Sequence, residues 1–573
     1  MAKCIFICAR RTLPDSIGNQ LFEICKKLAP DNITPAAPEI IVNGDIAYGI
    51  MNPTSTLRKN GNSLLLGQIF GNDIDWDQPL QSFPDGSYAL FRCGKEYCEI
   101  VSDIVASRTI WYYMDENIFV TSTSQRMIIM FLGSFDFDER VIPWVLSTGT
   151  LGPGFSWDKR IKRIPVDSSI ILDRNNWLLN TNSNPIEFKS VKRSDNLHEK
   201  LLRESLRTTF ETLNIDYSRW ILPLSGGYDS RGILCLILET NTAIHNLRTI
   251  TWGLKSSLAI KGNDAYVAKE LAGKCQVSNK YYCNDLSEEP VDNIINRFVL
   301  LGEGRIDNFS DYLDGFKMWK TIFEDGIEGI IRGEEGFGCH RYWSRIIVRL
   351  NQSLNLCSDL SNLKDYKKYG FHMHKVPNNL NKRKWETLST WRDRIFHEHT
   401  LPTVFSALAD LKLSYVEQIN PLLSRTILQQ IRNLPDHLRT EKALFKKIVN
   451  SISPEIDYAH SVSSASLNEI LKEKKIVKLL RNELSSDIAK TIFPVSFLNF
   501  VLKGIKSKDE LITIKTNSAS LRSIINKNLP RFLNNILREI FLPSVDPNVL
   551  GFRVLLICRM NRILHDDIKI SYK

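Results

Sequence analysis

The first 190 positions are a series of short apolar runs separated by turn residues. Residues 64–71, 83–91 and 99–105 each combine apolar and β-branched positions with Gly, Pro or Asp, which is typical of short strands. Residues 110–120 predict a hairpin with Asp115, Glu116 and Asn117 as its turn. Several short strands joined by turns predict packed antiparallel sheets for this part of the chain.

From residue 191 the pattern changes to apolar strands that alternate with helical stretches. After a charged segment and a helix at 191–219, strands are expected at 220–224, 247–252 and 280–282, with helices expected over the apolar run 232–238 and at 264–272. This alternation predicts a parallel sheet that binds its ligand at the carboxyl ends of the strands. Pro223 lacks a backbone N–H, so it fits a central strand only at the strand's end.

The strand-to-helix turn Ser225-Gly226-Gly227-Tyr228-Asp229-Ser230 carries the strongest chemical signal. Its glycines let an anion approach the backbone N–H groups, its serines add hydroxyls, and the next helix directs its positive end at the same point. Asp229 offers an oxygen ligand for the Mg²⁺ that accompanies nucleotide phosphates. No Lys-Ser/Thr pair follows the glycines, so the turn is not the P-loop of kinases.

This turn resembles the SGGxDS pyrophosphate loop of N-type ATP pyrophosphatases, which release AMP and pyrophosphate. A second cluster, Gly333-Glu334-Glu335-Gly336-Phe337-Gly338, resembles the later acidic motif of one such family, the asparagine synthetases. The resemblance implies that ATP and Mg²⁺ are cofactors and that Glu334 joins Asp229 as a metal ligand. It also implies that the phosphates are bound by Ser225, Gly226, Gly227, Asp229 and Ser230.

Two later residues match catalytic positions of the same family. Residues 416–424 resemble its E-x-R-x-P-F-L-D segment, which makes Glu417 the carboxylate that handles the nucleophile's proton. Residues 433–446 resemble its LP…K-x-x-L segment, which makes Lys442 the cation that steadies charge on the phosphate and on the tetrahedral intermediate.

The order of motifs between residues 83 and 128 resembles the glutaminase domain of the asparagine synthetases, with two departures. That chemistry needs a cysteine at the mature N-terminus, where the free α-amine is the base. Here Ala2 follows Met1, and Cys4 comes two positions too late. The family's Asn-Gly pair, which helps to hold the oxyanion, reads Leu66-Gly67, and leucine donates no hydrogen bond. We therefore expect this domain not to hydrolyse glutamine.

The resemblance implies a fold of class α+β followed by α/β. A glutaminase-like β sandwich would occupy residues 1–190, an ATP-pyrophosphatase domain with a parallel sheet residues 191–470, and a basic helical extension residues 471–573. The implied activity is that of an ATP-dependent ligase that adenylates a carboxylate and joins it to an amine or ammonia.

The substrates of such a ligase are left open by the sequence. The carboxylate could belong to a small molecule, a peptide or a sugar acid. The alternatives are therefore an asparagine synthetase proper, a lasso-peptide-type macrolactam synthetase or a glycan amidotransferase. A degenerate nucleotide-binding docking protein is the non-enzymatic alternative, and the intact phosphate loop argues against it.

Composition narrows the class of protein without naming a substrate. Of the 573 residues, 43% are hydrophobic and 24% charged, which is ordinary for a globular protein of two to four domains. No apolar run reaches the roughly 18–20 residues that cross a bilayer, and the first apolar patch precedes its arginines, the reverse of a secretory signal. We expect a cytoplasmic location, with neither a membrane nor a nucleic acid as partner.

The charge is concentrated near the C-terminus. Residues 471–573 hold 19 Lys and Arg against 9 Asp and Glu, an excess equal to the +10 of the whole chain. These residues could bind an acidic partner, although solvated faces of surface helices are the commoner explanation.

The cysteines and histidines give no metal signal. The 11 cysteines contain no C-x-x-C, so the sequence predicts neither a disulfide framework nor a zinc site. Cys93 and Cys98 could flank a hairpin turn, but free buried thiols are expected. The close pairs His372/His374 and His397/His399 lack matching ligands and are expected at the surface.

Overall fold

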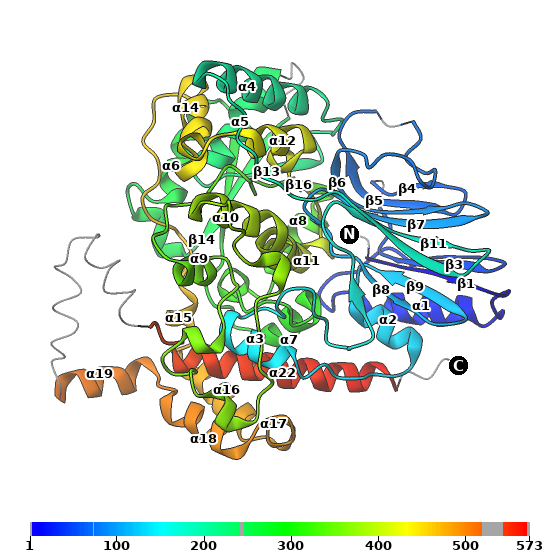
Figure 1. Ribbon diagram of the computed structural model, residues 1–573. Helices are drawn as coiled ribbons and strands as arrows, with labels where there is room; N and C mark the ends of the chain where they lie inside the picture. The colour runs from blue at the N-terminus through cyan, green and yellow to red at the C-terminus, as the bar shows by residue number, and fades with distance from the viewer. Residues whose placement is uncertain (1–2, 55, 73, 241–245, 518–541, 570–573) are drawn as a thin grey trace.

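Two six-stranded sheets face each other in the N-terminal part of the chain (Figure 1). The computed structural model describes residues 3–54, 56–72, 74–240, 246–517 and 542–569. The first sheet has the strand order β10-β8-β9-β1-β3-β2 and the second β12-β11-β7-β6-β5-β4, and the neighbouring strands are antiparallel. The strands are β1 (Lys3–Ala9), β2 (Glu39–Asn43), β3 (Ile46–Met51), β4 (Arg58–Asn60), β5 (Ser63–Ile69), β6 (Gly86–Cys93), β7 (Tyr97–Ser102), β8 (Trp111–Met114), β9 (Ile118–Ser122), β10 (Lys162–Arg163), β11 (Ser168–Asp173) and β12 (Leu178–Ser183).

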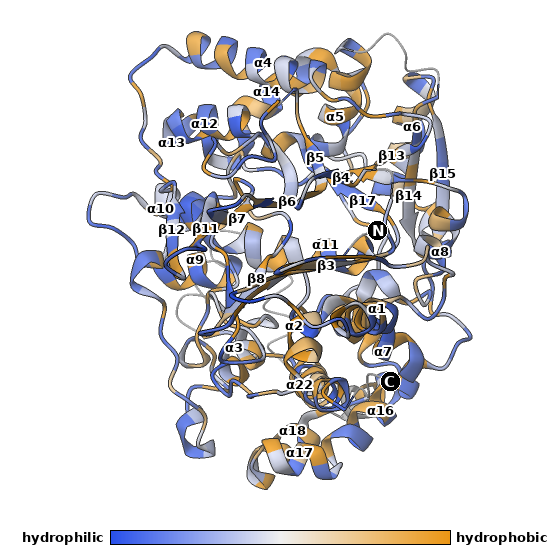
Figure 2. Cartoon of the chain, turned by 90° about the vertical axis from the view of Figure 1, so that its right-hand side faces the viewer, coloured by the Kyte–Doolittle hydropathy of each residue, from blue (hydrophilic) through white to orange (hydrophobic). Residues whose placement is uncertain are grey.

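Strand β1 explains how this sandwich is filled. Every residue of β1 is buried, because the strand has a packed layer on both faces. Cys4, Phe6 and Cys8 point into the core between the sheets, whereas Ile5 and Ile7 pack with the helices on the other face. Figure 2 shows the first sheet lying between the second sheet and helices α1 (Ile17–Leu28) and α2 (Gln125–Leu132).

The third sheet is parallel and forms the centre of the rest of the chain. Its strand order is β15-β14-β13-β16-β17, with β13 (Trp220–Pro223), β14 (Arg248–Gly253), β15 (Ser278–Cys283), β16 (Gly329–Ile331) and β17 (Glu417–Ile419). The prediction of antiparallel sheets followed by a parallel sheet is thus confirmed. Pro223 ends central strand β13, where its missing N–H is tolerated. The chain runs outward from β13 on one side and resumes at β16 on the other, so a topological switch point lies between them.

Helices surround this sheet and extend it (Figure 1). They are α3 (Val141–Thr148), α4 (Asp195–Glu211), α5 (Tyr228–Thr240), α6 (Asp264–Lys274), α7 (Val291–Gly302), α8 (Lys317–Glu324), α9 (Arg345–Asn351), α10 (Leu388–Ile395), the π-helical η6 (Phe396–Phe405), α11 (Ser406–Leu413), α12 (Arg425–Asn433), α13 (Asp436–Arg439), α14 (Ala443–Ile452) and α15 (Leu467–Ile470).

The C-terminal region joins the core instead of standing apart from it. Its described helices are α16 (Lys474–Leu484), α17 (Asp487–Ile492), α18 (Val495–Gly504), α19 (Lys508–Asn517) and α22 (Pro547–Asp567). Helix α22 passes beneath α3 and α7 in Figure 1 and is buried over most of its length. Its arginines are paired, for example Arg553 with Asp307 at 2.7 Å. The boundary at residue 470 and the acidic partner stay predictions.

The prediction of surface histidines is wrong for three of the four. His374, His397 and His399 are buried, because η6 and its surroundings pack inside the helical part. Backbone groups supply most of their polar contacts: His397 Nε2 lies 3.2 Å from the oxygen of Gly336, and His374 Nε2 accepts from the Cys357 N–H at 3.3 Å. Burial lowers the pKa of His399 to about 4, so this side chain stays neutral near pH 7. Within the described residues, no helix combines the length and apolar character needed to cross a membrane.

Candidate functional site

The glycine turn predicted to bind phosphate lies at the carboxyl end of β13. The chain leaves the strand with a hydrogen bond from the Leu224 N–H to the carbonyl of Ile250, 2.8 Å long. Gly226 has a φ of +68°, and a Cβ there would lie 2.7 Å from the side chain of Val267. Only glycine fits this position without displacing α6. The turn therefore places the backbone close to the N-terminus of α5, as the motif predicts.

Ser225 and Ser230 hold the turn closed. The Ser225 N–H donates to the Ser230 hydroxyl at 3.1 Å, and the two hydroxyl oxygens are also 3.1 Å apart. Both residues line a cavity of about 520 Å³. Because the hydroxyls and the first N–H groups of the 13-residue helix α5 converge here, the turn can donate several hydrogen bonds to one anion.

A lysine joins two carboxylates beside this turn. Lys442 Nζ lies 2.8 and 2.7 Å from the two carboxylate oxygens of Asp229 and 3.0 Å from Glu335 Oε1. The structure thus brings together the predicted residues Asp229 and Lys442. Glu335, which the sequence did not single out, completes the group.

Within the described part of the chain, Lys442 is the one cation bound directly to the two carboxyls of this group, Asp229 and Glu335. Burial is the largest effect on both carboxyls; it raises the pKa of Asp229 and raises that of Glu335 to about 7, although Lys442 opposes both shifts. The pKa of Lys442 is raised as well, since its two anionic partners outweigh its own burial. One cation therefore faces two carboxyls, and an added positive charge would stabilise their ionised forms.

Glu334 lines the same cavity as Asp229 but has a different partner. Its Oε1 accepts hydrogen bonds from the Arg332 guanidinium at 2.9 and 2.7 Å. Burial opposes ionisation of Glu334, yet Arg332 lowers its pKa on balance. The buried Oε2 atom has no hydrogen-bond partner among the described residues. Such an orphaned carboxylate oxygen is a donor atom that suits a hard cation.

The residues present fit Mg²⁺ bound together with a nucleotide. Among the described residues, no group of three or more His, Cys, Asp or Glu is arranged to hold a metal. Nucleotide-bound Mg²⁺ does not require one, because it usually takes one or two protein carboxylates together with phosphate oxygens and water. Asp229 and Glu334 on one cavity wall, with Glu335 next to Asp229, provide that number.

The cavity is built at the switch point between β13 and β16. The turn after β13, the ends of β14 and β16 and the N-terminus of α6 supply most of its lining, and its volume lies within the usual range of ligand sites. Its lining residues are Pro223, Leu224, Ser225, Asp229, Ser230, Thr251, Trp252, Asp264, Ser310, Asp311, Arg332, Gly333, Glu334, Phe405, Val462, Ser464, Ala465 and Ser466.

A late segment, residues 456–466, crosses the glycine turn and forms one wall of the cavity. Arg231 anchors it, because its guanidinium donates to the carbonyls of Ile456 and Asp457, both at 2.8 Å. The Tyr228 and Tyr458 rings stack with centroids 3.7 Å apart. Sequence reasoning missed this segment; the one available signal was Arg231, a charged residue directly before the apolar run of α5 at residues 232–238.

Glu417 lies outside the cavity lining. The residue occupies β17, is 1% exposed, and pairs with Arg108 of the N-terminal sandwich. Its neighbour Gln418 points the other way, into a small cavity that shares Glu334 and Phe405 with the large one. The position of Glu417 therefore lends no support to its predicted role, which stays a prediction.

The small cavity is lined by unpartnered acceptors. Its volume of about 10 Å³ is close to the space that one water molecule needs. Gln418 Oε1, Asn420 Oδ1 and Glu334 Oε2 are buried there without hydrogen-bond partners among the described residues. A small ligand that donates several N–H groups would satisfy them.

The N-terminal sandwich shows where the glutaminase residues would be. Ala2 lies outside the described residues. The Cys4 side chain is buried between the sheets, which raises the pKa of its thiol well above the usual value. The Leu66 side chain is likewise part of the sandwich core. In the described part of the chain, neither Cys4 nor Leu66 is among the residues that line the large cavity or the small one.

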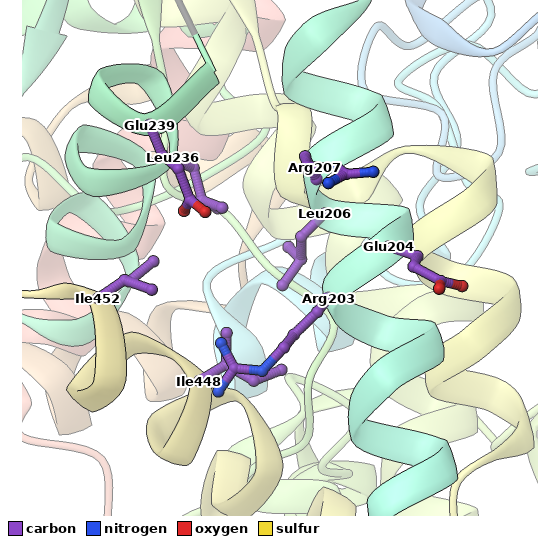
Figure 3. Close-up of a pocket in the computed structure, with 8 residues that line it drawn as sticks. All are labelled: Arg203, Glu204, Leu206, Arg207, Leu236, Glu239, Ile448 and Ile452. Carbon is purple, nitrogen blue, oxygen red and sulfur yellow. The ribbon is translucent and has the colours of Figure 1, made fainter.

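A further cavity, of about 250 Å³, lies between α4, α5 and α14 (Figure 3). Its floor is apolar, from Leu206, Leu236 and Ile448, and its rim carries charged side chains. Arg203 on this rim is already bound to Glu199 at 2.8 Å. This cavity contains none of the predicted site residues.

Comparison with known proteins does not identify the family of the chain. No protein-family model and no curated protein matches it. Among solved structures, it is similar to the glutamine phosphoribosylpyrophosphate amidotransferase of B. subtilis complexed with ADP and GMP, with 10% identity, 50% of this chain and 67% of that chain covered, and a TM-score of 0.20.

Two other solved structures give similar values. The allosteric regulatory enzyme of purine biosynthesis shares 9% identity over 50% of this chain and 81% of its own, with a TM-score of 0.21. The U34-tRNA thiolase NcsA from Methanococcus maripaludis, with its 4Fe-4S cluster, shares 15% identity over 56% of this chain and 91% of its own, with a TM-score of 0.20. Similarities this low do not establish a shared fold, so the site is interpreted from its own residues.

Proposed function

We propose that the chain is an ATP-dependent ligase that adenylates a carboxylate and transfers the acyl group to a nitrogen nucleophile, as the asparagine synthetases do. One observation carries the proposal. The glycine turn after β13 and the acidic turn after β16, predicted separately from the sequence, line one cavity at the switch point of a parallel sheet.

Different residues of the site would bind the phosphates of ATP and the Mg²⁺ that accompanies them. Ser225, Ser230 and the N–H groups at the start of α5 would hold the pyrophosphate portion, and Asp229 and Glu334 would hold Mg²⁺. When bound, Mg²⁺ would offset the charge of the phosphates. Lys442 supplies a fixed positive charge beside Asp229, where negative charge grows on the leaving pyrophosphate.

The proposed chemistry proceeds in two steps. A substrate carboxylate oxygen attacks the α-phosphorus of ATP, the bond from that phosphorus to the β-phosphate oxygen breaks, and pyrophosphate leaves. A nitrogen nucleophile then attacks the acyl carbon, AMP leaves, and the nitrogen loses a proton to give an amide. Adenylation is needed because a carboxylate is a poor electrophile, whereas AMP is a competent leaving group.

The small cavity supports a small amine or ammonia as the nucleophile. Gln418 Oε1 and Asn420 Oδ1 are both hydrogen-bond acceptors, so an N–H donor suits them better than another acceptor would. Glu334, the proposed Mg²⁺ ligand, lines both cavities, so the amine would lie next to the proposed adenylate site.

The test is carboxylate-dependent exchange of labelled pyrophosphate into ATP. The purified protein is offered aspartate, peptides with free side-chain carboxylates, and sugar acids, with Asp229→Asn as the matched control against a contaminating synthetase. If one class of carboxylate supports exchange in the wild-type protein but not in Asp229→Asn, the result supports the ligase and identifies its substrate class. Nucleotide binding without exchange across all three classes would instead support the docking protein.

A further inference from the structure

Three cysteines from both sheets of the N-terminal sandwich meet at one end of it. Cys8 is the penultimate residue of β1 in the first sheet. Cys93 ends β6 and Cys98 is the second residue of β7, and the two stand directly opposite each other in the second sheet. We call Cys8, Cys93 and Cys98 the thiol cluster. It lies outside the proposed ligase site.

The backbone holds Cys93 and Cys98 in a geometry that suits a disulfide. The Gly94 N–H donates to the Tyr97 carbonyl at 2.9 Å, and the Cys93 N–H points to the other side, to Ser63 Oγ at 2.9 Å. Cys93 and Cys98 are therefore a non-hydrogen-bonded pair, the kind in which facing side chains come closest. Their Sγ atoms are 2.8 Å apart, against about 2.05 Å in a disulfide.

Cys8 brings a third sulfur from the opposite sheet. Its thiol is hydrogen-bonded to Cys98, and this contact is the largest effect that lowers the pKa of Cys8. Arg174 lowers the pKa of Cys8 further, and its guanidinium also donates to the carbonyl of Gly94 at 2.6 Å. Burial and Asp45 oppose this effect on Cys8. Hydrogen bonds to the other two thiols, together with burial, raise the pKa of Cys98 well above its usual value. The cluster's geometry, with three sulfurs in contact, therefore carries the inference.

The cluster has one partly exposed member. Cys93 is partly exposed beside the turn at residues 94–97, whereas Cys8 and Cys98 are buried. A small reagent can therefore approach Cys93 first. Among the described residues, no group of three or more His, Cys, Asp or Glu is arranged to hold a metal ion, and this includes the three thiols.

We propose that the thiol cluster is a thiol–disulfide exchange site for low-molecular-weight disulfides, R–S–S–R. The Cys93 thiolate attacks one sulfur of the reagent, and the S–S bond breaks to release RS⁻. Cys98 then attacks the Cys93 sulfur, loses its proton and expels the second RS⁻. The two protein thiols are oxidised by two electrons, and R–S–S–R is reduced to two RSH.

Cys8 allows a second disulfide to form from the first. Its thiolate can attack the Cys98 sulfur, which forms a Cys8–Cys98 bond and returns Cys93 to a thiol, with no net oxidation. The Cys93–Cys98 bond links neighbouring strands of one sheet, whereas the Cys8–Cys98 bond ties the two sheets together. The cluster would thereby convert the redox state of the surrounding solution into a cross-link inside the sandwich.

The experiment uses the full chain with oxidised glutathione, followed by alkylation of free thiols, trypsin digestion and mass spectrometry. Trypsin cuts after Arg92 and Lys95, so a Cys93–Cys98 bond joins two peptides and can be identified. We expect this bond, or the Cys8–Cys98 bond formed from it, in the wild-type protein, and its reversal by dithiothreitol. In Cys93→Ser the accessible nucleophile is gone, so buried Cys8 and Cys98 should stay free thiols. In Cys98→Ser, glutathione should stay on Cys93.

The matched control is Cys283→Ser, which removes an exposed cysteine outside the cluster and should leave the cross-link unchanged. If Cys98→Ser fails to fold, Cys93→Ser, at a partly exposed position, still tests the exchange. The proposal is overturned if glutathione modifies Cys283 in the wild-type protein while Cys8, Cys93 and Cys98 remain free thiols. Cross-links between cysteines of different molecules only would overturn it as well.

Discussion

Glu335→Gln offers the sharpest test of the proposed nucleotide site. The carboxyl of Glu335 has a pKa of about 7, raised mainly by burial, while Lys442 lies 3.0 Å away. The ordinary value is about 4.3, so between these pH values the folded protein keeps a proton that the unfolded chain loses. The stabilising effect of this proton is complete below about pH 4 and is lost as the pH rises through about 7.

Binding of Mg²⁺ and ATP should have the opposite pH dependence, because an added cation stabilises the ionised carboxyls. With a pKa of about 7, roughly one-tenth of Glu335 is ionised at pH 6 and roughly nine-tenths at pH 8. If only the ionised form binds, the apparent affinity rises about tenfold over this range, or about 1.4 kcal/mol.

The assay is calorimetric titration with Mg²⁺ and a non-hydrolysable ATP analogue at pH 6 and pH 8. The analogue's own protonation affects every variant equally, so the informative quantity is the difference between the wild type and Glu335→Gln. The variant should bind more weakly at pH 8 and lose most of the tenfold change. Glu398→Gln is the control, because Glu398 is another carboxyl with a raised pKa, but it pairs with Arg394 and not with Lys442. An unchanged ratio in Glu335→Gln would refute the linkage.

The other predictions concern the remaining site residues. Asp229→Asn should lower pyrophosphate exchange about a hundredfold or more without changing the melting temperature, since it removes one charged ligand. Lys442→Met should lower both exchange and amide yield, because Asp229 and Glu335 lose their shared cation. If Glu417 is the acid/base, Glu417→Gln should keep pyrophosphate exchange, while the rate of amide formation falls by about 10² to 10⁴. A lower melting temperature, with both rates reduced equally, would instead show a structural role. Glutamine should yield no glutamate, as an enzymatic glutamate assay can check.

Much of the fold was predictable because the relevant signals are local. The glycine turn, the strand before it and helix α5 follow from residues within about twenty positions of one another. Pro223 could be placed at a strand end because a missing N–H is a local property. The antiparallel and parallel sheets were predictable from the lengths and spacing of apolar runs in the same way.

The rest of the site depends on distant contacts that no local pattern encodes. Glu334 and Glu335 are adjacent acids. Glu334 pairs with nearby Arg332, whereas only the fold brings Glu335 to Lys442, about a hundred residues later. Residues 456–466 carry no motif, yet Arg231 binds their carbonyls from α5. The buried histidines were missed for the same reason, because their partners are backbone groups of other segments: carbonyls for His397 and His399, and the Cys357 N–H for His374.

The contacts between the sandwich and the parallel-sheet region explain why a sandwich without glutaminase residues would persist. Arg108 pairs with Glu417, Lys3 lies 3.5 Å from Glu303, and Arg425 lies 2.7 Å from Asp167. All three pairs are largely buried, and removing one partner from such a pair costs about 3–5 kcal/mol, because a charge remains without compensation. Loss of the sandwich would remove the partners of Glu417, Glu303 and Arg425 together and expose the surfaces that now bury them. Strand β17 carries both Glu417 and Gln418, which lines the small cavity, so the sandwich supports the site's architecture whether or not it handles glutamine.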